Sequence, residues 1–224
     1  MREAPGGVSS LRRRLAHGLD RHAPGLGHDL RRAGGRLDPD LSLASLLCSR
    51  DRPAVCVGAG DGGWARELAR RASSVVVFEP DRARWPHLQR LGGRRLRLES
   101  VVLCDHHGRV QRRNPAGSES ALELRTLDSF TLGEVSLIRI EAGALARSVL
   151  DGAAATLEAS RPCVLVARSS GGAEVAAWLS ARRLEPVAAS DEMQAGDLLF
   201  APVEQAELRA RLAAARISRP RGTR

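Results

Sequence analysis

Short apolar runs alternate with amphipathic segments through the central two thirds of the chain. Seven of these runs have the length and apolar content that are typical of buried strands. They span residues 54–57, 74–78, 96–104, 135–140, 163–167, 184–188 and 198–201. Segments with apolar residues at helical spacing lie between several of them, at 64–72, 82–91, 145–159 and 172–183. This alternation predicts an α/β fold, in which a mainly parallel sheet has helices on both faces.

The two ends of the chain differ from this central part. Residues 1–50 are interrupted by glycine pairs and carry only short helical patterns, which predicts an Arg-rich helical cap. Residues 205–217 have leucines at helical spacing and predict a basic closing helix. With 224 residues, the chain has room for one domain with extensions. We therefore divide it into the cap at 1–50, a central domain at 51–203 and a basic helical tail at 204–224.

The formal net charge of +9 is concentrated in these two ends. Residues 53–202 carry 19 arginines against 18 acidic residues, whereas residues 1–52 carry ten against six and residues 203–224 six against two. A basic surplus can indicate nucleic-acid binding. However, aromatic residues make up only 3% of the chain and Tyr is absent, so little is available to stack on bases. We expect no nucleic-acid partner; the alternative, binding through the Arg-rich ends, predicts a steep salt dependence.

Neither a membrane span nor a secretory signal is predicted. Every apolar run is far shorter than the about 20 residues that a membrane-spanning helix needs, and no apolar stretch follows residues 12–14, which are all arginine. We therefore expect a cytoplasmic protein. The four cysteines, Cys48, Cys56, Cys104 and Cys163, form no Cys-x-x-Cys pair and are expected to be reduced and mostly buried. No metal site is predicted, because no His or Cys pair has ligand spacing.

The most informative local feature is a glycine-rich turn between the first predicted strand and the following helix. It comprises Gly58, Ala59, Gly60, Asp61 and Gly62. Glycine at such a turn lets the backbone approach a ligand closely, and the free N–H groups at the helix start favour anionic or polar groups. Glu79 follows the second strand, 21 residues after Gly58. A carboxylate there can accept hydrogen bonds from both ribose hydroxyls of a nucleoside cofactor.

The turn by itself leaves the cofactor open. Gly58, Gly60 and Gly63 fit the Gly-x-Gly-x-x-Gly pattern of dinucleotide-binding proteins, which would favour a nicotinamide-dependent dehydrogenase. Gly58, Gly60 and Gly62 fit a methyltransferase pattern equally well. A glycine turn with an unrelated acidic residue is the structural alternative to both.

Beyond the turn, the order of motifs resembles the FkbM-type family of S-adenosylmethionine-dependent methyltransferases over residues 54–202. Apart from the turn, the resembling segments are Phe-Glu-Pro-Asp at 78–81, Arg-Thr-Leu-Asp-Ser-Phe at 125–130, Leu-Ile-Arg-Ile-Glu at 137–141, Val-Leu-Asp-Gly-Ala at 149–153 and Leu-Leu-Phe at 198–200. The resemblance implies a seven-strand Rossmann-like sheet that is mostly parallel with an antiparallel last strand. It also implies methyl transfer from S-adenosylmethionine to a hydroxyl group of a sugar or another small molecule.

The resemblance further implies a cofactor site. The turn residues and Pro80 would contact S-adenosylmethionine, with Gly58, Gly60 and Gly62 shaping the place of its methionine part. Glu79 would hold the ribose.

Two further acids are candidate catalytic residues. Glu141 and Asp128 match acids of the family motifs, and Glu141 follows a central strand at the sheet edge where ligands gather. A general base typically accelerates such a reaction about 10²–10⁴-fold. The alternatives stay open: Glu141 as a surface or helix-capping carboxylate, and Asp128 as a helix cap.

Departures from the family pattern motivate a second hypothesis. Cys56 stands where the family commonly has Asp, and Gly143 and Ala146 stand where it has acids. A degenerate methyltransferase-like domain, which binds a nucleoside or a partner protein without catalysis, is therefore the alternative function.

Three further polar residues are interpreted as solvated rather than functional. His106 and His107 lie between extended runs and are interpreted as solvated residues of a hairpin turn. Arg139 is interpreted as a solvated cation, with contact to an acidic group of the substrate as the alternative. The acceptor and the oligomeric state are not predicted.

Overall fold

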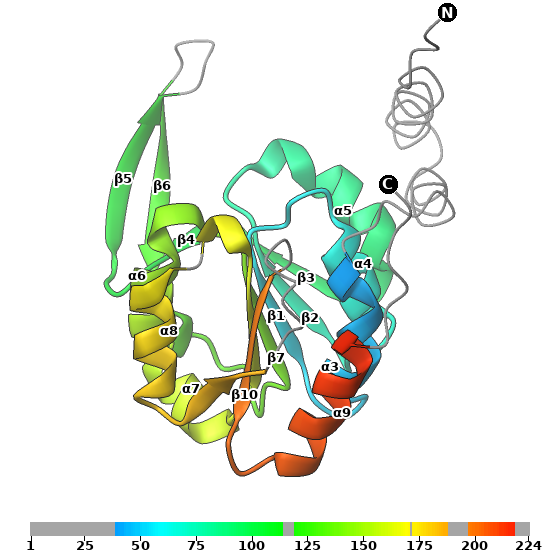
Figure 1. Ribbon diagram of the computed structural model, residues 1–224. Coiled ribbons are helices and arrows are strands. Elements are labelled where there is room, and N and C mark those ends of the chain that lie inside the picture. The colour runs from blue at the N-terminus through cyan, green and yellow to red at the C-terminus, as the bar shows by residue number, and fades with distance from the viewer. Residues whose placement is uncertain (1–38, 114–118, 171, 188–196, 218–224) are drawn as a thin grey trace, which may run out of the picture.

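The computed structural model describes residues 39–113, 119–170, 172–187 and 197–217 (Figure 1). Most of the predicted cap, residues 1–38, therefore lies outside the described residues, as does the end of the predicted tail, residues 218–224.

Seven strands form the main sheet, in the spatial order β3-β2-β1-β7-β8-β10-β9. Their bounds are β1 Ala54–Val57, β2 Val75–Phe78, β3 Leu96–Glu99, β7 Leu137–Ile140, β8 Cys163–Val166, β9 Leu184–Pro186 and β10 Leu198–Pro202. β1 pairs in parallel with β2 and β7, β2 with β3, and β7 with β8. β10 is antiparallel to both of its neighbours, β8 and β9. The predicted sheet, mostly parallel with an antiparallel last strand, is confirmed.

Helices cover both faces of this sheet, as predicted (Figure 1). On one face lie α6 Ala146–Asp151, α7 Ala154–Ser160 and α8 Ala173–Ser180; on the other lie α3 Ala44–Leu47, α4 Gly63–Ala69, α5 Trp85–Gly92 and α9 Ala206–Ile217. The short 3-10 helices in the described ranges are η1 Pro39–Leu43, η2 Arg82–Arg84, η3 Gly93–Arg95, η4 Leu127–Ser129, η5 Gly143–Leu145 and η6 Arg168–Ser170. No helix in the described ranges is long and apolar enough to cross a membrane.

Burial on both faces explains why the central strands read as continuous apolar runs. In β1, Val55 and Val57 belong to the hydrophobic cluster on the α6–α8 side, whereas Ala54 and Cys56 belong to the cluster on the α4 side. All four residues are buried, as are all residues of β2, β7 and β8. Strands of this kind are predictable from sequence because every position is apolar, with Arg139 of β7 as the exception among these four strands.

The described parts of the predicted cap and tail pack into the same core. Leu43 and Leu47, from η1 and α3, are 1% and 3% exposed and belong to the cluster on the α4 side. Leu212 of α9 is fully buried in that cluster. These segments are therefore part of the packed domain rather than separate attachments.

A second, small sheet corrects two predictions. Its strands are β4 Val101–Leu103, β5 Gly108–Arg113 and β6 Glu119–Arg125, in the order β4-β6-β5. The run predicted as one strand at 96–104 is divided, because β3 pairs with β2 whereas β4 pairs with β6. His106 and His107 do connect extended segments, but not as a hairpin turn, because β6 lies between β4 and β5. The polar residues of β5 and β6 concealed these strands, which form an arm that projects from the domain in Figure 1.

The single helix predicted at 145–159 is also divided, into α6 and α7, by close backbone contact at Gly152. A Cβ atom at this position would overlap the carbonyl oxygen of Cys104. The Gly152 carbonyl oxygen also accepts a hydrogen bond from the Asp128 N–H, at 3.0 Å. Gly152 is thus the point where α6 touches the end of β4 and the η4 turn, and the chain changes direction there.

Replacing Gly152 with Ala tests this contact. We expect the Gly152→Ala variant to unfold with a free energy lower by about 1–3 kcal/mol, because the added methyl group meets backbone atoms that cannot rotate away. Gly108→Ala is the control, since a Cβ atom there meets only side-chain atoms, none nearer than 3.7 Å; its change should stay within about 0.5 kcal/mol. Urea denaturation of both variants measures the difference, and equal stabilities would contradict the contact.

Candidate functional site

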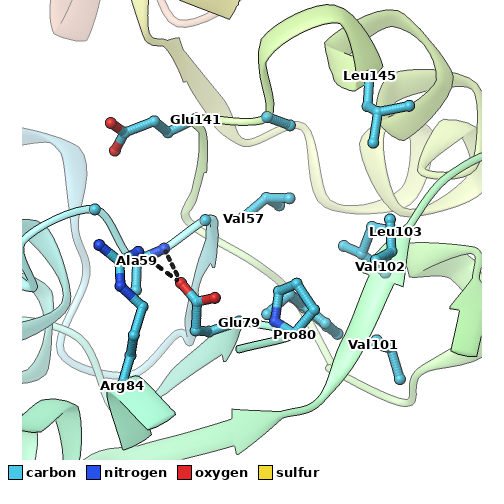
Figure 2. Close-up of a pocket in the computed structure, with 14 residues that line it drawn as sticks. Val57, Ala59, Glu79, Pro80, Arg84, Val101, Val102, Leu103, Glu141 and Leu145 are labelled. Atoms are coloured by element: carbon cyan, nitrogen blue, oxygen red, sulfur yellow. Dashed lines mark hydrogen bonds and ion pairs between the residues drawn. The ribbon is translucent and has the colours of Figure 1, made fainter. Parts of the chain in front are cut away.

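A cavity of about 400 Å³ lies at the carboxyl ends of β1, β2 and β7 (Figure 2). The strand order reverses here, because β2 lies on one side of β1 and β7 on the other. Ligands of open α/β sheets bind at such switch points. The volume is within the range of about 300–1,000 Å³ that is usual for small-molecule sites.

The glycine turn after β1 forms one wall, wedged between the ends of β2 and β7. The Gly58 N–H donates to the Phe78 carbonyl at 3.0 Å, and the Glu141 N–H donates to the Val57 carbonyl at 2.8 Å. Gly58 has φ +80°, and a Cβ atom on it would overlap the Glu141 carbonyl oxygen. Gly60 has φ +55°, and its Cβ would lie 2.7 Å from Glu141 Oε2. Both positions have a left-handed backbone that favours glycine, and at Gly58 the space left by the Glu141 backbone requires it as well.

Only part of the predicted cofactor-binding turn reaches the cavity. Gly58, Ala59 and Gly60 line it, whereas Asp61 and Gly62 lie outside the lining. Gly62 is the N-cap residue of α4, and the Asp61 carboxylate accepts a hydrogen bond from the Gly63 N–H at 2.8 Å. Asp61 and Gly62 thus shape the start of α4.

Glu79 and Pro80 line the cavity, and the Glu79 side chain is tightly held. It is only 5% exposed. Its Oε1 accepts from the Asp81 N–H at 3.0 Å. Its Oε2 accepts from the Ala59 N–H at 3.4 Å and from Arg84 Nη1 at 3.2 Å (Figure 2). The carboxylate therefore joins the glycine turn to the start of η2.

Arg84 is a lining residue that the sequence analysis missed. Its position five residues after Glu79 carries no motif, and only the turn of η2 brings its guanidinium back to that carboxylate. The apolar lining residues Val101, Val102, Leu103 and Leu145 were missed as well. Figure 2 shows them opposite the polar group of Glu79 and Arg84. The cavity thus has a polar end and an apolar end.

Glu141 lines the cavity, with its carboxylate on the side of the glycine turn rather than the side of Leu145 (Figure 2). Its side chain is 39% exposed, and Oε2 accepts a hydrogen bond from Arg139 Nη1 at 2.8 Å. The Arg139 guanidinium lies 5.3 Å from the centre of the Trp64 ring and 3.7 Å from the Asp197 carboxylate. An arginine therefore fixes the direction of the candidate base.

The interpretation of Arg139 as a solvated cation is wrong, because the residue is 5% exposed. It lies opposite Cys56 in the pairing of β7 with β1. Burial alone would lower the pKa of the Arg139 guanidinium, but Cys56, Glu141 and Asp197 outweigh it, and the pKa is raised. Burial raises the pKa of the Cys56 thiol to about 11.

Asp128 lies outside the lining and holds the start of α7. Its Oδ2 accepts from the Ala155 N–H at 2.9 Å, and its Oδ1 accepts from the Thr156 N–H at 2.8 Å and from the Thr156 hydroxyl at 2.7 Å. These bonds satisfy free N–H groups of the helix start. The geometry supports the helix-capping alternative for Asp128 rather than the catalytic one.

A further group of polar side chains lies just after β4, beyond the lining residue Leu103. Potential ligand atoms of Cys104, Asp105 and His106 lie within 4.8 Å of one another, a convergence that sequence spacing did not predict. Within this group, His106 Nδ1 lies 2.7 Å from Asp105 Oδ1. Asp105 Oδ1 also accepts a hydrogen bond from the Ser148 hydroxyl. These two hydrogen bonds, that of His106 first, lower the pKa of Asp105.

The cysteines are free, and three of the four are buried while Cys48 is half-buried. The prediction of mostly buried thiols is therefore confirmed.

No known family model matches the chain, and no curated protein does. Solved structures with a similar fold do exist. The methyltransferase FkbM from Methylobacillus flagellatus KT is 17% identical with a TM-score of 0.52, over 68% of this chain and 44% of that one. An rRNA methylase from Streptococcus thermophilus is 12% identical (TM-score 0.46; 72% and 91% covered). The N-methyltransferase NodS from Bradyrhizobium japonicum WM9 is 13% identical (TM-score 0.43; 72% and 88% covered).

The chain thus spans less than half the length of the FkbM protein that it resembles. At 17% identity, this likeness shows the fold: the chain has the Rossmann-like fold of methyltransferases. Membership of the FkbM-type family stays a prediction from the sequence motifs.

Proposed function

We propose that this protein is an S-adenosylmethionine-dependent methyltransferase that methylates a hydroxyl group of a small molecule or sugar. The observation that carries this proposal is the buried Glu79 carboxylate, which is held against the glycine turn at one end of a cavity at the switch point of the sheet. A carboxylate in that place suits a vicinal diol, as found in ribose.

The residues around the cavity fit the proposed cofactor. The backbone at Gly58–Gly60 offers a cradle that side chains would fill, since a Cβ on Gly60 would lie 2.7 Å from Glu141 Oε2. This cradle would take the polar methionine part. Glu79 would hold the ribose, and the apolar wall Val101–Leu103, with Pro80, would face the adenine ring. When bound, the cofactor would supply an electrophilic methyl group on a sulfonium.

The chain's own contribution to the chemistry is positioning and proton removal. Aligning an acceptor with the methyl group in a shielded cavity supplies much of the rate. A hydroxyl group also needs a base, since its own pKa is far above 7. Glu141 would accept that proton at Oε1, since Oε2 accepts a hydrogen bond from Arg139. We therefore propose Glu141 as the catalytic base and Arg139 as the residue that positions it.

Cofactor binding is tested by titration with S-adenosylhomocysteine, the proposed product. We expect the protein to bind it and Glu79→Gln to weaken binding at least about tenfold, because an amide cannot accept both ribose hydrogen bonds as a carboxylate does. Glu99→Gln is the matched control: Glu99 ends the neighbouring strand β3 and pairs with Arg97 instead. Isothermal titration calorimetry gives the dissociation constants.

Two results of this titration would count against the proposal. If the native protein bound no S-adenosylhomocysteine at millimolar concentration, the proposed function would be wrong. If Glu79→Gln bound it as tightly as the native protein, Glu79 would have no part in the site.

Catalysis is tested by transfer of a labelled methyl group to a panel of hydroxyl-bearing sugars, other small molecules and RNA. We expect Glu141→Gln to lower kcat about 10²–10⁴-fold, because the general base is lost. Its affinity for S-adenosylhomocysteine should change by less than about threefold, since the Arg139 contact can be kept by the amide oxygen. Glu158→Gln, an exposed carboxylate on α7, is the control.

The panel also separates the rival functions. Cofactor binding without any methylated product would favour a degenerate binding domain. Methylated RNA would overturn the small-molecule acceptor, and full activity of Glu141→Gln would remove Glu141 from catalysis.

A further inference from the structure

The Glu79 carboxylate has few hydrogen-bond positions left for a ligand. Its two oxygens offer about four acceptor positions in all. Three are taken, by the N–H groups of Asp81 and Ala59 and by the guanidinium of Arg84. A ribose presents two adjacent hydroxyls, so one of the present donors has to leave before both hydroxyls can bind.

The three donors differ in how easily they can move. The Ala59 N–H directly follows Gly58, whose own N–H donates a hydrogen bond to the Phe78 carbonyl at 3.0 Å. The Asp81 N–H belongs to a turn that is closed by a 3.1 Å hydrogen bond from the Arg84 N–H to the Asp81 carbonyl. Displacing either N–H would shift the backbone that forms the cavity wall.

Arg84 differs from these two because it reaches Glu79 with a long side chain that is 49% exposed. Side chains of this kind change rotamer without disturbing the backbone, and the buried Glu79 carboxylate keeps its two backbone N–H donors when the guanidinium leaves. The Arg84 guanidinium is therefore the donor that a ligand can replace.

From this asymmetry we propose that Arg84 occupies the acceptor position on Glu79 that a vicinal diol requires, and that a nucleoside with two ribose hydroxyls displaces it on binding. Arg84 thereby becomes a specificity-determining residue of the cavity. The inference rests on the proposed function, because it needs a nucleoside-containing ligand at Glu79.

The number of hydroxyls on the ligand then decides whether Arg84 matters. A ligand with one ribose hydroxyl can use the fourth acceptor position and leave the ion pair intact. A ligand with two has to break it. Removing Arg84 is therefore expected to favour diol ligands and to leave single-hydroxyl ligands unchanged.

The experiment compares three ligands with four proteins. The ligands are S-adenosylhomocysteine, adenosine and 2′-deoxyadenosine, and the proteins are the native chain, Arg84→Ala, Arg84→Met and Arg82→Ala. Methionine keeps much of the length of the arginine side chain but carries no donor, so it separates occupation of Glu79 from simple bulk. Arg82 is the matched control, since it lies in the same η2 turn but bonds to Ser100 and lies over Trp85.

We expect Arg84→Ala and Arg84→Met to bind S-adenosylhomocysteine and adenosine about two- to fivefold more tightly than the native chain, because no contact to the exposed Arg84 guanidinium has to be broken first. Binding of 2′-deoxyadenosine should be unchanged, and Arg82→Ala should behave as the native chain with all three ligands. Calorimetric titration gives the affinities, and circular dichroism checks that each variant is folded.

Several results would overturn the inference. Unchanged affinities in both Arg84 variants, alongside S-adenosylhomocysteine binding by the native chain, would overturn it and leave the proposed function standing. Weaker binding would show that Arg84 contacts the ligand directly. Equal tightening for all three ligands would show that Arg84 merely fills space. Absence of binding in every protein would overturn the proposed function together with the inference.

Discussion

The close backbone approach of Gly58 to Glu141 is the constraint on which the rest of the site depends. At Gly58 the chain leaves β1 and passes so near the end of β7 that no Cβ atom fits. Hydrogen bonds to Phe78 on one side and between Val57 and Glu141 on the other close the contact. The turn thereby links the ends of three parallel strands at the edge of the sheet where the cavity lies.

Two charge pairs flank this turn, and each gives the cavity a different property. Burying a charge is costly unless it is paired. Glu79 is paired through backbone N–H groups and Arg84, so it is a fixed acceptor beside the turn. Arg139 is buried in the sheet, and its ion pair with Glu141 orients that carboxylate toward the glycine turn. The ligand-holding acid and the candidate base are thus set by different arginines.

Prediction from sequence succeeded where burial is uniform and failed where long-range contact overrides the local pattern. β1 and β8 are apolar at every position because both sides of the sheet are covered. β5 and β6 carry polar residues on an arm beyond the core, so the pattern of apolar residues did not reveal these two strands. The break at Gly152 lies within a helical pattern, and its cause, the Cys104 backbone, is 48 residues away in the chain.

The sequence by itself determined the strand–turn–helix unit around Gly58 and the place of Glu79, because both follow from offsets within one βαβ segment. Tertiary structure alone decided which side chains complete the cavity. Arg84 reaches Glu79 only through the fold of η2, and Val101–Leu103 form the apolar wall only because β4 leaves the main sheet. It also placed Asp128 at the start of α7. Such contacts join segments whose separation in the chain carries no periodic signal, so only packing can select them.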